Sequence, residues 1–69
     1  MDMNFNHEER MLMMLYNTGT RMGLIHELRL MQCYLMPDET ALRELSEQVI
    51  EKLKRLTDAE FAGLEFPMN

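Results

Sequence analysis

A histidine and a cysteine are the residues of this chain that could together bind a metal ion or act as base and nucleophile. His26 and Cys33 are seven positions apart, which puts them on one face of a helix. Two turns separate them by about 10 Å along the axis, too far for one ion or for a catalytic hydrogen bond. We therefore expect no metal site and no cofactor, and we expect Cys33 to be a small, partly buried apolar residue.

Carboxylates are the other candidates for catalysis. Most of the Asp and Glu residues fall on the predicted outer face of a helix or in a first helical turn, where solvation or capping explains them. Paired catalytic carboxylates need a cleft that separates their pKa values, and a small helical bundle has little room for one. The sequence therefore predicts that the protein is not an enzyme.

The charge of the chain bears on nucleic-acid binding. The formal net charge is −5, so the overall field repels phosphate. Only Lys52, Lys54 and Arg55 form a basic cluster, and their place in the last turn of a helix favours a role in stabilising the helix dipole. Direct nucleic-acid binding through these three residues, aided by Arg21, stays open as an alternative function.

Six consecutive apolar residues, Met11 to Tyr16, are the most informative feature of the sequence. At about 100° per residue they point in every direction around a helix, so one neighbouring surface cannot bury them all. A chain of 69 residues is too short to surround that helix. Part of the run should therefore contact water, a partner or a ligand.

We predict a partner-binding surface on this run and on the outward side of the following helix, which is too apolar for a solvated face. The predicted contact residues are Met11, Met14, Tyr16, Arg21, Met22 and His26. The partner is an unidentified protein. A homodimer through the first helix would cover the same surface, and a small apolar ligand among the methionines is a further alternative.

The elements that would position these residues are four helices, at about 7–17, 21–35, 37–56 and 58–63. Asn6 with Glu9 and Thr57 with Glu60 have the pattern of a capping box, and Thr20 is a natural N-cap. The second and third helices each carry one apolar stripe, formed by Leu24, Leu28, Met31 and Leu35 and by Leu42, Leu45, Val49, Leu53 and Leu56. The sequence therefore predicts an all-α fold, a three-helix bundle closed by a short fourth helix, in one domain of residues 1–69 with an ordered core at about 6–66.

Turn residues predict the helix boundaries. Gly19 can take the left-handed conformation that ends the first helix, and Pro37 suits the first position of the third. Gly23 is expected to give space for the backbone of a neighbouring helix. Phe61, Leu64 and Phe66 are expected to close one end of the bundle.

Cysteine usage and hydropathy predict where the protein works. A single cysteine cannot form an intrachain disulfide and fits a reducing compartment. The N-terminus lacks the order of a signal peptide, and a six-residue apolar run is far below the roughly 20 residues needed to cross a bilayer. We expect a cytoplasmic protein that does not bind membranes.

Several short phrases together resemble the transposon-transfer assisting proteins, short chains encoded on bacterial conjugative transposons. The resemblance covers about residues 6–67 and implies a small helical bundle that assists transfer of a mobile element. It supplies no catalytic residue. We therefore expect an accessory protein that contacts the transfer machinery. The phrases are Tyr16-Asn17-Thr18-Gly19-Thr20-Arg21, Gly23-Leu24-Ile25, Glu27-Leu28, Pro37-Asp38-Glu39-Thr40 and Leu56-Thr57-Asp58-Ala59-Glu60-Phe61.

Overall fold

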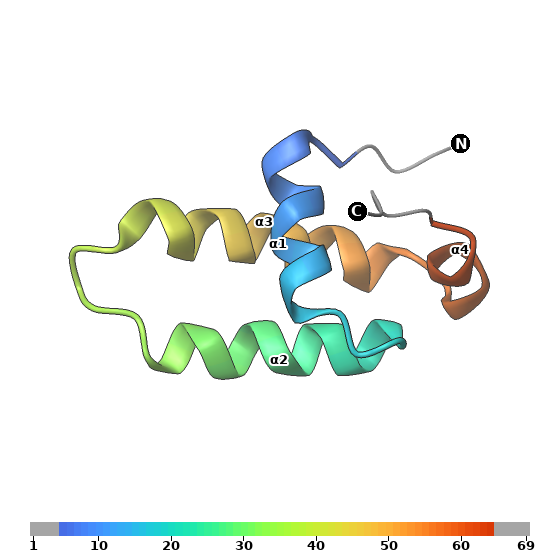
Figure 1. The fold of residues 1–69 in the computed structure, drawn as a ribbon, viewed down its shortest axis with the longest axis horizontal. Helices are drawn as coiled ribbons and strands as arrows, with labels where there is room; N and C mark the ends of the chain where they lie inside the picture. The colour runs from blue at the N-terminus through green and yellow to red at the C-terminus, as the bar shows by residue number, and fades with distance from the viewer. Residues whose placement is uncertain (1–4, 65–69) are drawn as a thin grey trace.

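The fold is all-helical, as the sequence predicts (Figure 1). A computed structural model describes residues 5–64, which form helices α1 (His7–Tyr16), α2 (Arg21–Cys33), α3 (Thr40–Arg55) and α4 (Asp58–Ala62) and no β-strand. Helices α2 and α3 lie side by side as an antiparallel hairpin, α1 crosses this hairpin, and α4 packs near the start of α2. The three-helix bundle with a short fourth helix is confirmed.

The core lies where the three longer helices meet. Met13 of α1, Leu28 of α2 and Ile50 of α3 are each fully buried. One apolar stripe from each helix is buried against the other two, and this burial is the main source of stability in so small a domain. The remaining buried hydrophobic residues are Phe5, Leu12, Leu24, Ile25, Val49, Leu53, Leu56 and Phe61.

The first turn of α1 contains a buried carboxylate. The Asn6 side chain accepts a hydrogen bond from the Glu9 backbone N–H at 2.8 Å, and Glu9 Oε1 accepts one from the Asn6 N–H at 2.9 Å, so the predicted capping box is confirmed. Glu9 Oε1 also accepts a hydrogen bond from Lys52 Nζ of α3 at 2.7 Å. The Lys52 ammonium lies 5.5 Å from the centre of the Phe5 ring. These contacts attach the start of α1 to α3.

The connection between α1 and α2 differs from the prediction in detail. Helix α1 ends at Tyr16 with Asn17 extended, and Gly19 takes φ +101° inside the connection and not at the helix end. Thr20 caps α2 as predicted, because its side chain accepts a hydrogen bond from the Gly23 N–H at 3.0 Å. A Cβ on Gly23 would collide with the side chains of Thr18 and Thr20. Gly23 therefore makes room for the connection, and the prediction that it faces a neighbouring helix backbone is wrong.

The start of α3 also differs. Pro37 and Asp38 lie in a turn closed by a hydrogen bond from the Glu39 N–H to the Met36 carbonyl at 3.0 Å, and the helix begins at Thr40. The Glu39 carboxylate accepts a hydrogen bond from the Met36 N–H at 2.7 Å. The prediction that Pro37 opens the helix is wrong because proline suits the second position of a turn equally well.

The short helix α4 closes the end of the bundle opposite this turn (Figure 1). Thr57 and Glu60 form the predicted capping box. Leu56 and Phe61, which flank the cap, are both buried in the core, as a hydrophobic staple requires. Leu64 packs against the core, and the predicted contribution of Phe66 lies outside the described residues.

Candidate functional site

The apolar run of α1 is only partly buried. Leu12 and Met13 face the core, Met14 is half-buried, and Met11 and Leu15 are 39% and 74% exposed. Met11 and Leu15 are one turn apart and therefore share a face of the helix. The expectation that part of the run stays uncovered is therefore confirmed for the part of the chain that the structure describes.

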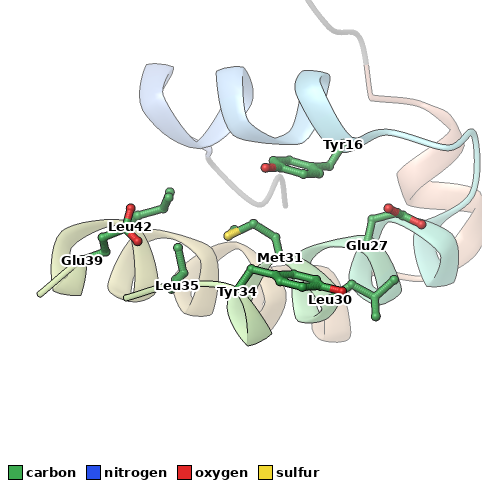
Figure 2. Close-up of a pocket in the computed structure, with 8 residues that line it drawn as sticks. All are labelled: Tyr16, Glu27, Leu30, Met31, Tyr34, Leu35, Glu39 and Leu42. Carbon is green, nitrogen blue, oxygen red and sulfur yellow. The ribbon is translucent and has the colours of Figure 1, made fainter. Parts of the chain in front are cut away.

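The exposed face of α1 borders two adjoining depressions. One lies between α1 and the first half of α3, and its apolar lining includes Met11, Leu15 and Leu45. The other lies beneath Tyr16, which overhangs Met31 of α2 (Figure 2). Leu42 of α3 lines both. We call them together the hairpin groove, whose apolar lining is Met11, Leu12, Leu15, Tyr16, Leu30, Met31, Tyr34, Leu35, Ala41, Leu42 and Leu45.

The groove exists because α1 lies across the hairpin and not along it (Figure 1). A helix that crosses in this way covers a strip about as wide as its own diameter, roughly 10 Å, whereas the sixteen residues of α3 span about 24 Å. The part of the hairpin next to the Met36–Glu39 turn therefore extends beyond α1 (Figure 1). Of the six large hydrophobic residues that are exposed in the described chain, four line this groove: Met11, Leu15, Leu30 and Tyr34.

The charged residues of the groove are acidic. Glu8 lines the depression beside α3, and Glu27 and Glu39 line the depression beneath Tyr16. None of the described residues that line either depression is Lys or Arg. One lining residue is a histidine, His7. The groove therefore combines an apolar floor with a negatively charged rim.

The predicted partner-binding residues divide between this groove and other places. Met11 and Tyr16 line the groove, and Met14 is half-buried beside it on α1. Met22 and His26 are exposed one turn apart on α2 and line neither depression. The sequence did not predict four of the groove residues: Leu15, Leu30, Tyr34 and Leu42. Leu15 belongs to the apolar run of α1, and Leu30 belongs to the outward side of α2.

Arg21 has an intramolecular role. Its Nη1 donates a hydrogen bond to the Leu53 carbonyl in the last turn of α3 at 3.1 Å, and its Nε donates one to Asp58 Oδ1 at 2.9 Å. The same carbonyl also accepts a hydrogen bond from the Leu56 N–H at 3.2 Å, and a cation at the C-terminus of a helix interacts favourably with the dipole. The side chain joins the start of α2 to the α3–α4 junction.

We expect Arg21→Gln to lower the free energy of unfolding by about 1 kcal/mol, because it removes these hydrogen bonds and the favourable dipole interaction. Asp58→Asn should cost less than about 0.5 kcal/mol, because the Asp58 side chain is 80% exposed. Urea unfolding of both variants measures the difference. Equal costs would contradict the role assigned to the Leu53 carbonyl.

The basic cluster is partly engaged within the fold. Lys52 contacts the buried Glu9, and Lys54 Nζ lies 3.6 Å from Glu51 Oε2 on the same helix. Arg55 is exposed at the end of α3. Lys52 belongs to the basic cluster of the alternative nucleic-acid-binding hypothesis, and in the structure its ammonium is paired with the Glu9 carboxylate.

His26 and Cys33, the candidate metal ligands or base and nucleophile, lie in no cluster of metal-ligating residues within the described chain. Within residues 5–64 no three His, Cys, Asp or Glu side chains are grouped so that they could hold a metal ion. Cys33 is exposed at the end of α2, so the prediction of a partly buried residue is wrong. No described helix combines the length and apolar character of a membrane span.

Comparison with known proteins identifies one family. The model of a family described as "Putative transposon-transfer assisting protein" matches residues 5–67, which include all four helices and the hairpin groove. No curated protein and no solved structure matches the chain.

Proposed function

Because the chain belongs to the family of transposon-transfer assisting proteins, we propose that it is a cytoplasmic accessory protein of a conjugative transposon. It assists transfer by binding another protein through the hairpin groove, and it has no catalytic activity of its own. The observation that carries this proposal is the gathering of Met11, Leu15, Leu30 and Tyr34 around one groove.

The chemistry of the groove supports a protein partner. Contiguous exposed apolar surface with a polar rim is typical of protein–protein contact sites. Phosphate binding would need basic residues, and the charged residues that line this groove are Glu8, Glu27 and Glu39. Nucleic-acid binding at the end of α3 has less support, because the Lys52 ammonium already contacts Glu9.

Leu15→Glu tests the proposal. The side chain is 74% exposed, so the variant should fold normally. Burial of a leucine contributes roughly 1.5 to 3 kcal/mol to binding, and a carboxylate in its place adds a desolvation cost. We expect the frequency of element transfer to fall at least about tenfold when the variant replaces the native protein, since each 1.4 kcal/mol is about a tenfold change in affinity.

Met22→Glu is the matched control. Met22 is 60% exposed on α2 and lines neither depression, so the same change of an exposed apolar residue to glutamate should leave transfer unchanged. Circular dichroism and thermal unfolding establish that both variants fold. Native transfer with a folded Leu15→Glu variant would refute the groove as the functional surface. A loss confined to Met22→Glu would move that surface to the outer face of α2.

A further inference from the structure

We propose that the hairpin groove receives an amphipathic helix of the partner whose polar face carries Lys and Arg. This inference rests on the proposed function and specifies the chemistry of the partner at the same site. Three properties of the groove carry it: the absence of a strand edge among residues 5–64, the two adjoining depressions, and the acidic rim.

The backbone chemistry of the groove favours a helical occupant. Its walls are helices α1, α2 and α3, where backbone groups pair along each helix, and the α2–α3 connection, where the N–H groups of Tyr34, Leu35 and Glu39 are also hydrogen-bonded. An extended peptide lying on this apolar floor would bury its own N–H and C=O groups without partners. Addition of a strand needs a sheet edge, and residues 5–64 contain no strand. A helix satisfies its backbone internally and presents only side chains.

The shape of the groove suits side chains that project from one face of a helix. The depression beneath Tyr16 has a volume of about 500 Å³ and the one beside α3 about 360 Å³, so each has room for a large apolar side chain. They meet at Leu42. Anchors at positions i and i+3, i+4 or i+7 of a helix lie on one face at successive turns, which is how helices occupy such grooves.

The rim selects the charge of that helix. Glu8 and Glu27 form no ion pair with the described part of the chain, and the Glu39 carboxylate accepts a hydrogen bond from a backbone N–H and not from a cation. Complementary charges at a rim steer association and reject wrong partners. A partner helix with an acidic polar face would be repelled by the rim and by the net charge of −5.

The same argument disfavours a second copy of this chain. In a two-fold dimer built groove against groove, the rim carboxylates of Glu8, Glu27 and Glu39 would face the same acidic patch of the partner copy. Like charges brought together across an interface oppose association. The groove is therefore suited to a basic partner of different sequence.

A pair of synthetic peptides tests the inference. Both are helical peptides of about 15 residues with the same leucine face, and they differ only in a polar face of lysines or of glutamates. Two-dimensional amide NMR of the full chain follows each titration. We expect the lysine peptide to bind at least about tenfold more tightly at about 50 mM salt, with the difference shrinking at about 200 mM. The largest shifts should fall at Leu15, Tyr16, Leu30 and Tyr34.

Neutral variants separate apolar contact from charge attraction. Leu15→Gln should weaken binding of the lysine peptide about tenfold, whereas Met22→Gln should leave it unchanged. Equal affinity for both peptides, or no binding of either, would overturn the inference. So would shifts centred on the acidic outer face of α3, or concentration-dependent dimerisation through the groove.

The outcome is distinguishable from that of the proposed function. If the lysine peptide does not bind the groove but Leu15→Glu still reduces transfer, the basic helix is refuted and the protein-contact function stands. If the peptide binds the groove but Leu15→Glu leaves transfer unchanged, the proposed function fails, and the inference built on it falls as well.

Discussion

Lys52→Met will lower the free energy of unfolding by about 2 to 3 kcal/mol, because it leaves the buried carboxylate of Glu9 without its cation. The Glu9 side chain is 1% exposed, so water cannot replace the lost ammonium. The estimate lies below the usual cost of breaking a fully buried pair because the Lys52 side chain is 29% exposed. In a domain of this size the change corresponds to a fall in Tm of about 15 °C.

The two members of this pair should respond unequally. Glu9→Gln should cost only about 1 kcal/mol, because the amide oxygen can still accept the hydrogen bond from the Asn6 N–H and Lys52 reaches solvent. The double variant should cost less than the sum of the two single changes. Lys54→Met is the matched control, with an expected change within about 0.5 kcal/mol, since its ion pair with Glu51 is exposed. Strict additivity in urea unfolding would contradict the coupling.

Met13→Ala will lower the free energy of unfolding by about 3 kcal/mol, because it leaves a cavity at a fully buried position between α1 and the hairpin. Leu15→Ala, two residues further along the same apolar run, should change it by less than about 0.5 kcal/mol, since that side chain is 74% exposed. Guanidinium unfolding with equal m-values would measure both.

Comparing Met13→Ala with Leu15→Ala separates the effect of the apolar run on stability from its effect on partner binding. The same Leu15→Ala variant that keeps its stability should lose affinity for the groove's occupant. Similar losses of stability for Met13→Ala and Leu15→Ala would mean that the run is buried throughout, and the argument for an open groove would fail.

Local signals explain why the helices could be predicted from the sequence. The capping boxes at Asn6 and Thr57 and the N-cap at Thr20 depend on residues within three positions of each other, and all three formed as predicted. Pro37 was misplaced because the same residue types suit a turn and a first helical turn. Boundaries set by such residues need knowledge of the neighbouring packing.

Long-range contacts explain what could not be predicted. Glu9 and Lys52 are 43 positions apart, and Arg21 and Asp58 are 37 apart, so their pairing depends on how α1 and α4 meet the hairpin. Arg21 therefore looked like a free cation, and Lys52 like part of a basic cluster. The groove residues Leu30 and Tyr34 carry no periodic signal of their own, because exposure there results from where α1 crosses the hairpin.

Fixing α1 at both ends determines how the groove meets a partner. The Glu9–Lys52 contact holds its first turn against α3, and the short connection through Gly19 holds its last turn at the start of α2. A wall restrained in this way is preorganised, so association loses little conformational entropy in α1. Such a docking surface exists before any encounter, and its association rate is then governed by diffusion and electrostatic steering instead of a slow rearrangement.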